Sequence, residues 1–148
     1  GDPPGEISRR RGVVAAFLAA SREGDFDALL TMLDPDIVLR ADHAAAQMGA
    51  DAEAIGPRAV AGIFSGRAKA LRPALIDGAP GAVWTYRGET RVVFAFTFTG
   101  GTITAIEQIA DPERIARFEV TPLKAGLKTQ RGQLAGSSGI ALARTTLA

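Results

Sequence analysis

The sequence predicts an α+β fold in which a curved antiparallel sheet packs over three helices from the first half of the chain. Two neighbouring runs, residues 91–99 and 102–109, are rich in Val, Ile, Thr and Phe, which favour strands. Gly100-Gly101 between them tolerates the positive φ of a tight turn, so the two runs predict an antiparallel hairpin. Alternate residues give its first strand a strongly apolar face: Val92, Phe94, Phe96 and Phe98. Such a face needs a cover, and helices are expected to supply it.

Composition limits the classes of protein to which the chain can belong. With 148 residues, 47% of them hydrophobic, it can bury one sizeable core, so we expect a single domain. The sequence has no cysteine and one histidine, so we expect neither a disulfide nor a metal site nor a cofactor. No apolar run approaches the roughly 20 residues that cross a bilayer. The prediction is a soluble, cytoplasmic protein that does not contact a membrane.

Composition and charge divide the chain into three predicted parts. Residues 1–8 should be a linker or a cloning remnant, residues 9–120 the domain, and residues 121–148 a basic tail that contains Gly and Ser. Before Thr121 there are 13 basic and 16 acidic residues, whereas the tail has four basic residues and no acidic one. The acidic body argues against direct DNA binding, because duplex affinity depends on cations that neutralise phosphates. The tail could contact a nucleic acid, but a solvated terminus is the simpler interpretation.

Two helices are predicted at the start of the domain. The first runs from about Arg9 to Arg22, and Gly24 is placed as the left-handed residue that ends it. Asp25 can cap a second, short helix in which apolar residues recur at helical spacing as far as Leu33. Asp34-Pro35 is expected to end this helix.

A strand and a third helix should follow. Residues 36–42 predict a strand, and the Ala-rich residues 44–48 can be strand or loop. Gly56-Pro57 marks a helix start, because proline at the first helical position loses no hydrogen bond. This helix is expected to end at Arg72-Pro73. Its predicted apolar stripe consists of Val60, Ile63, Phe64, Ala68 and Leu71.

The rest of the domain is predicted to be mainly strands. Residues 74–77 and 82–87 should form two strands joined through a turn that contains Gly and Pro, directly before the central hairpin. Strands joined by short connections usually pair with one another, so these four strands should be sequential neighbours. Asp111 and Pro112 then predict the N-cap and first residue of a short helix over 111–118.

Several segments resemble a known superfamily. Gly24-Asp25-Phe26-Asp27-Ala28-Leu29 and Leu33-Asp34-Pro35-Asp36-Ile37-Val38-Leu39, in this order of elements, resemble the SnoaL-like branch of the NTF2-like superfamily. This resemblance implies a cone, in which the curved sheet wraps over the helices and leaves a pocket between them. Superfamily relatives that are enzymes, such as polyketide cyclases, ketosteroid isomerases and epoxide hydrolases, use a carboxylate inside an apolar cone.

A narrower resemblance points to one group of extracytoplasmic-function RNA polymerase sigma factors, over roughly residues 10–120. In that group the segment similar to Ala110–Ile115 usually reads Asn-Pro-Asp-Lys-Leu, for which this chain has Asp-Pro-Glu-Arg-Ile. The segment after the first strand often reads Asp-Gly-Gly-Gly-Lys, of which this chain keeps only Asp42. The segments that look like the C-terminal domain of those sigma factors are residues 41–42, 56–61, 64–68 and 110–115.

The narrower resemblance implies a regulatory domain that modulates transcription initiation. Its partners would be the promoter-reading sigma regions or the RNA polymerase core, and the chain would be an excised C-terminal piece. A small apolar ligand and a homodimer are further expectations. The alternatives are a SnoaL-type isomerase, cyclase or hydrolase that uses a buried carboxylate, and a ligand-binding dimer without catalysis.

Three residues are candidates for acid/base chemistry. Asp42 and His43 are adjacent, so at most one of them can point inward from a strand, and a capping or surface role is the simpler interpretation. Glu107 is expected to share a strand face with Ile103, Ala105 and Ile109, where burial would tune a carboxylate for proton transfer. Its simpler interpretation is a residue on the open face, or one paired with Arg91 across the hairpin.

Four residues are candidates for ligand binding. Trp84 and Tyr86 share one face of their strand and could line a pocket together with Arg91 and Glu107. Aromatic residues at this spacing more often belong to the core. The sequence contains no phosphate-binding glycine loop and no nucleophile elbow, so no catalytic signature supports the enzyme alternative.

Overall fold

In the part of the chain that the structure describes, the fold is an α+β cone built from one curved sheet and five helices. The computed structural model describes residues 4–67 and 69–123. The helices are α1 (Pro4–Glu23), α2 (Phe26–Met32), α3 (His43–Gln47), α4 (Pro57–Phe64) and α5 (Pro112–Ala116). The strands are β1 (Leu33–Ala41), β2 (Glu53–Ile55), β3 (Leu71–Ile76), β4 (Ala79–Tyr86), β5 (Glu89–Thr99), β6 (Thr102–Ile109) and β7 (Val120–Pro122). No helix in the described part of the chain is long and apolar enough to span a membrane.

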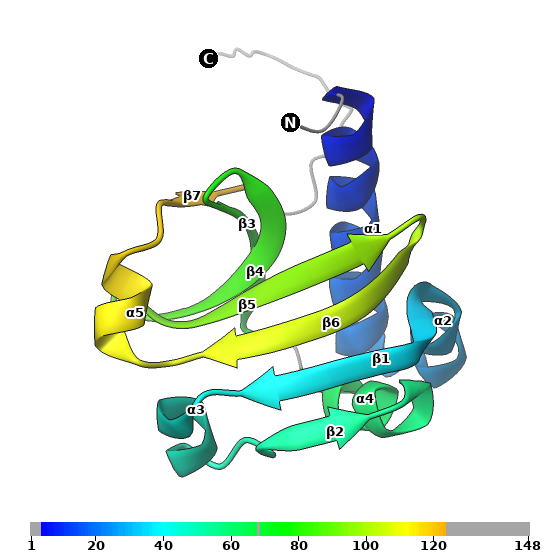
Figure 1. Cartoon of the computed structure of the whole chain (residues 1–148), viewed down its shortest axis with the longest axis horizontal. Helices are drawn as coiled ribbons and strands as arrows, with labels where there is room; N and C mark the ends of the chain where they lie inside the picture. The colour runs from blue at the N-terminus through cyan, green and yellow to red at the C-terminus, as the bar shows by residue number, and fades with distance from the viewer. Residues whose placement is uncertain (1–3, 68, 124–148) are drawn as a thin grey trace.

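The sheet follows the order β2-β1-β6-β5-β4-β3-β7 (Figure 1). The strands from β3 to β6 pair sequentially and antiparallel, as predicted. The expectation of a wholly antiparallel sheet is wrong at one place, because β1 runs parallel to β6. A parallel pair needs a long connection, and here α3, β2, α4 and three strands lie between the two partners.

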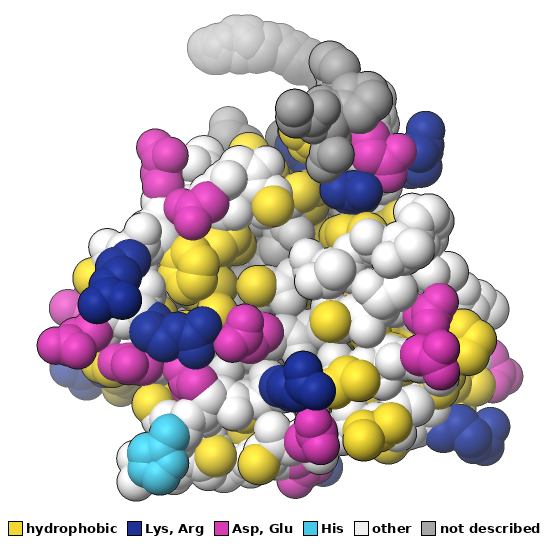
Figure 2. Space-filling view, in the orientation of Figure 1, with side chains coloured by type: hydrophobic (Ala, Val, Ile, Leu, Met, Phe, Trp, Pro, Cys, Tyr) yellow, Lys and Arg dark blue, Asp and Glu magenta, His cyan; other side chains and the backbone are white. Residues whose placement is uncertain are grey.

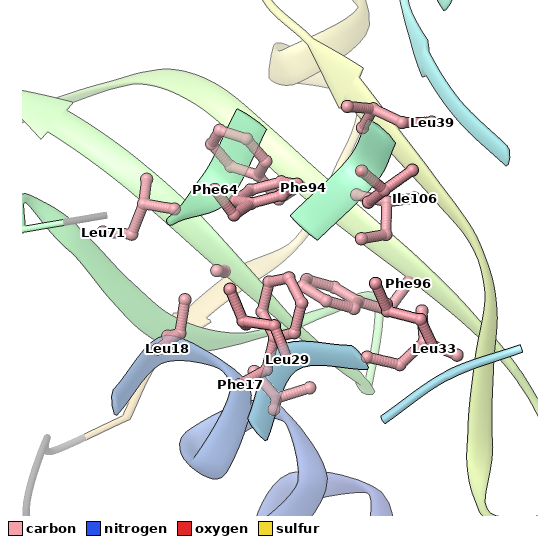
Figure 3. Close-up of a cluster of buried hydrophobic side chains, with 14 of the residues drawn as sticks. Phe17, Leu18, Leu29, Leu33, Leu39, Phe64, Leu71, Phe94, Phe96 and Ile106 are labelled. Atoms are coloured by element: carbon pink, nitrogen blue, oxygen red, sulfur yellow. The ribbon is translucent and has the colours of Figure 1, made fainter. Parts of the chain in front are cut away.

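The helices α1, α2 and α4 cover the inner face of the sheet, whereas α5 packs on the outer face. Phe17 of α1 meets Phe64 of α4 and Phe96 of β5 edge to face, with ring centroids 5.0 and 5.6 Å apart (Figure 3). The outer cluster joins Val93 and Ile109 to Ile115 and other partly buried residues that follow β6. Alternation along β5 therefore gives the sheet two apolar faces, of which the aromatic one is the larger.

Local signals located most of the helix ends. Gly24 has φ +70° and follows α1, and Asp25 caps α2 by accepting a hydrogen bond from the amide of Ala28 at 3.1 Å. Asp111 caps α5 by accepting from the amide of Glu113 at 3.0 Å, and Pro112 is the first helical residue. These predictions are confirmed.

Several predicted boundaries were wrong. Helix α1 begins at Pro4, inside the segment expected to be a linker, because proline is tolerated in a first helical turn. Helix α4 ends at Phe64, since Gly66 takes φ +76°, and Leu71 belongs to β3 rather than to a helical stripe. Strand β1 starts at Leu33, three residues before the predicted strand. Residues 44–48, which were expected to be strand or loop, lie mostly in α3.

The remaining differences lie in short strands and in the tail. The turn between β3 and β4 is Asp77-Gly78, both with positive φ, so β4 begins three residues before the predicted strand. Strands β2 and β7 were not predicted, because each has only three residues. β7 takes up residues 120–122, so it includes the start of the predicted tail, and residues 124–148 lie outside the described part of the chain.

Candidate functional site

The side chain of Asp42 joins two segments that are far apart in the sequence. Asp42 follows the last residue of β1, and its carboxylate accepts a hydrogen bond from the amide of Ala45 at 2.8 Å, which caps α3. The same carboxylate accepts from the amides of Ala110 and Asp111, each at 3.1 Å from Oδ2, although these residues lie 68 and 69 positions further along. One side chain thus ties the end of β1 to the connection between β6 and α5.

Arg114 of α5 completes this cluster. Its guanidinium lies 3.6 Å from Oδ2 of Asp42 and donates a hydrogen bond to Oε2 of Glu107 at 3.1 Å. Asp42 is only 10% exposed, whereas Glu107 is 47% exposed. We call Asp42, Glu107, Arg114 and the amides of residues 45, 110 and 111 the Asp42 junction.

The junction keeps Asp42 ionised. Burial raises the pKa of this carboxyl group, but the amides of Ala45, Ala110 and Asp111 and the charge of Arg114 outweigh burial, so the pKa of Asp42 is lowered. A general base must accept a proton near its operating pH, and both oxygens of Asp42 already accept hydrogen bonds. The geometry therefore fits a structural anion better than a proton-transfer group.

His43 does not join Asp42 in an acid/base pair. It is the first residue of α3 and is exposed, and the single histidine of the chain stands on the surface in Figure 2. Among the residues that the structure describes, no group of three or more His, Cys, Asp or Glu side chains could hold a metal ion.

Glu107 lies on the outer face of the sheet. A register shift between Thr97 and Phe98 of β5 places Ile103 opposite Phe98 but Ala105 opposite Thr97. The side chain of Ile103 therefore lies in the inner core, so the prediction that Glu107 shares a face with Ile103 is wrong, whereas Ala105 and Ile109 do share the face of Glu107. The predicted pairing with Arg91 is also not observed, because Glu107 pairs with Arg114 and Arg91 pairs with Glu89 at 3.3 Å.

The other three predicted ligand residues lie together. The ring of Trp84 packs against the inner core, and its centroid is 6.3 Å from that of Tyr86. Tyr86 is 49% exposed, and the guanidinium of Arg91 lies 5.7 Å from the centre of its ring. The structure thus separates the predicted set into an aromatic group at the end of β4 and a carboxylate at the Asp42 junction.

Gln108 is a residue that the sequence interpretation missed. It lies opposite Phe94 in the β5–β6 pair and is only 8% exposed, and its side chain makes no hydrogen bond to another described residue. The register shift in the β5–β6 pair, where β6 has one extra residue, hid it, because simple alternation from Ile103 places Gln108 on the other face. The role of Arg114 was also missed, although this residue lies in the Asp-Pro-Glu-Arg-Ile segment, because its partner Asp42 is remote in the chain.

The chain has no match among protein-family models or curated proteins. It is similar to the crystal structure of the extracytoplasmic function sigma factor SigJ of Mycobacterium tuberculosis, with a TM-score of 0.56 and 23% identity. That likeness covers 72% of this chain and 44% of SigJ, so the chain spans less than half the length of that protein.

Two further solved structures are similar. A de novo designed protein with a curved β-sheet has a TM-score of 0.50 and 18% identity over 72% of this chain and 88% of the design. An NTF-2-like protein of unknown function from Burkholderia xenovorans LB400 has a TM-score of 0.48 and 22% identity, over 87% of this chain and 97% of that one. At these identities the likeness to SigJ and to the designed protein concerns the fold alone, in which a curved sheet packs over helices as the sequence predicted.

Proposed function

We propose that this chain is the regulatory domain of an extracytoplasmic-function sigma factor and that it modulates transcription initiation by protein contact. Its partners are the promoter-reading sigma regions or the RNA polymerase core, and it acts in the cytoplasm without binding DNA itself. One observation carries the proposal. Two of the four segments that resemble the sigma-factor domain, residues 41–42 and 110–115, meet at the Asp42 junction.

The junction suits a contact domain because it fixes the positions of surface elements. Asp42 holds the start of α3 and the residues just before α5, and Arg114 ties α5 back to both Asp42 and Glu107. Figure 2 shows the face that carries α5, on which acidic and basic side chains lie side by side around exposed hydrophobic ones. A partner binds such a surface more tightly when its side chains are already ordered, because ordering them on binding costs free energy.

The same observations weigh against the enzyme alternative. The two carboxylates proposed as bases are held by backbone amides or by Arg114, and Glu107 is on the outer face. Ser21 and Gln108 are the two buried polar residues among those described, and the hydroxyl of Ser21 donates to the carbonyl of Phe17 at 2.8 Å. Among the described residues, Gln108 is thus the one buried polar side chain that makes no hydrogen bond to another described residue, whereas acid/base catalysis needs several placed groups.

A small-molecule ligand inside the cone is a second candidate, supported by Gln108. The side-chain amide of Gln108 is buried and has no hydrogen-bond partner among the described residues, so it carries a desolvation cost that a hydrogen bond from a ligand would offset. Such a ligand would be largely apolar, because Trp84 and Phe94 lie on the same inner face. A homodimer stays a prediction, which sedimentation of the purified chain tests.

The proposal is tested in the full reading frame of the parent protein. We expect deletion of residues 4–123 to change transcription from a promoter that the parent recognises, and Asp42→Asn to change it in the same direction. Asp36→Asn is the matched control, because Asp36 is an exposed residue of β1, the strand that leads to Asp42, and is in none of the side-chain hydrogen bonds or ion pairs of the junction. Unchanged transcription after the deletion would refute the regulatory function.

A further inference from the structure

The end of the β4–β5 hairpin carries an exposed tyrosine between two arginines. The guanidinium of Arg87 lies 5.3 Å from the centre of the Tyr86 ring, and that of Arg91 lies 5.7 Å from it. Both distances are within the range of cation–π attraction. The ring of Trp84 supports Tyr86 from the core side, at 6.3 Å and an angle of 34°. The arginine side chains are therefore held over a fixed aromatic ring.

The turn that presents this group is tight. Tyr86 pairs with Glu89, so Arg87 and Gly88 form a two-residue connection, with φ of +53° and +81°. Positive φ at both positions is typical of the primed turn that fits a twisted hairpin. Such turns favour Asn, Asp or Gly at the first position, and a long side chain there has a conformational cost. The presence of arginine at position 87 in spite of this cost indicates a functional role for its side chain.

Arg87 and Arg91 are the two charged groups that the structure places at this ring. We call Tyr86, Arg87 and Arg91 the Tyr86 patch. Within the described residues, Arg91 is the one cation of the patch with a carboxylate partner, Glu89.

The patch contrasts with the rest of the domain. Before Thr121 the chain carries more acidic than basic residues, so two arginines beside one acid, Glu89, are a local reversal of sign. Tyrosine and arginine are also enriched at the centres of protein interfaces, where they contribute a large share of binding energy. Figure 1 shows the turn between β4 and β5 at the end of the sheet where α5 packs, which is also the end that the Asp42 junction fixes.

We propose that the Tyr86 patch is the surface on which the domain binds an acidic segment of its protein partner. The inference rests on the proposed function, because it names the contact surface through which the domain would reach the RNA polymerase core. Carboxylates of the partner would accept paired hydrogen bonds from Arg87 and Arg91, whose planar groups are already oriented by Tyr86.

A protein segment fits the patch better than a nucleic acid. The guanidinium groups of Arg87 and Arg91 lie over the Tyr86 ring, which limits the ring face open to a stacking base. A phosphate chain longer than the patch would also meet the net negative charge of the remaining body. A short acidic peptide avoids both problems.

The test measures the affinity of the full-length parent protein for purified RNA polymerase core. Arg87→Glu and Arg91→Glu should each weaken binding by about tenfold or more, since each replaces an attraction by a repulsion. Arg11→Glu is the matched control, because Arg11 is an exposed residue of α1 and the charge change is the same; it should alter affinity by less than about twofold. Thermal melts of all variants check that the fold is retained.

Two results would overturn the inference. Equal affinity of the Arg87→Glu, Arg91→Glu and Arg11→Glu proteins would show that the patch is not the contact. Weakened binding to single-stranded or duplex DNA, with unchanged binding to the polymerase, would assign the patch to nucleic acid. If deletion of residues 4–123 alters transcription while the patch variants bind normally, the regulatory function stands and this inference alone fails.

Discussion

Replacement of Asp42 by alanine should destabilise the domain far more than replacement of another helix cap. Asp42→Ala removes the acceptor for Ala45 and also the acceptor for the amides of Ala110 and Asp111. Loss of a cap costs about 1 kcal/mol, and each amide left without a partner in a part-buried site costs at least about 1 kcal/mol more. The expected loss is therefore about 3 kcal/mol of the free energy of unfolding.

Asp25→Ala is the matched control for this prediction. Asp25 caps α2 through one bond, to the amide of Ala28, and lies on the surface, so its loss should cost about 1 kcal/mol. Urea denaturation followed by circular dichroism measures both variants on the same chain. If Asp42→Ala costs no more than Asp25→Ala, the amides of residues 110 and 111 do not depend on Asp42, and the account of the junction is wrong.

Three other predictions concern pH, packing and the buried amide. Because the pKa of Asp42 is lowered in the folded state, its contribution to stability is present above the ordinary pKa of 3.8 and is lost as pH falls through the folded value. In acid titration, Asp42→Asn should therefore lose less stability below about pH 4 than the wild type does. Identical curves for the two proteins would contradict this. Gly81→Ala should cost about 2 kcal/mol in urea denaturation, because its Cβ would lie 2.6 Å from the carbonyl oxygen of Phe94, whereas Gly101→Ala, with no atom nearby, should be close to neutral. Gln108→Leu should leave the melting temperature unchanged or raise it, since no hydrogen bond to a described residue is lost, and a fall of several degrees would show that the amide has a partner.

The features predicted correctly from the sequence are those set by local chemistry. The Gly100-Gly101 turn, the caps Asp25 and Asp111 and the aromatic face of β5 depend on residues close together in the chain. Hydrophobic alternation and capping signals report such short-range preferences directly. The sequence thus predicted the cone and the order of its main elements.

The features that were missed depend on pairing between distant segments. The position of Glu107 depends on a register shift in the β5–β6 pair, and a shift of one residue moves a side chain to the other face. The role of Asp42 depends on amides 68 and 69 residues away, which no local pattern indicates. The short strands β2 and β7 form through their neighbours, β1 and β3, rather than by their own propensity.

The most direct test of the regulatory account is reconstituted transcription with purified RNA polymerase core and the full-length parent protein. The account predicts that initiation at the parent's promoter changes when residues 4–123 are removed, and that the separately purified domain shows measurable affinity for the polymerase or for the promoter-reading regions. Equal initiation with and without the domain, together with no measurable affinity for either partner, would contradict it.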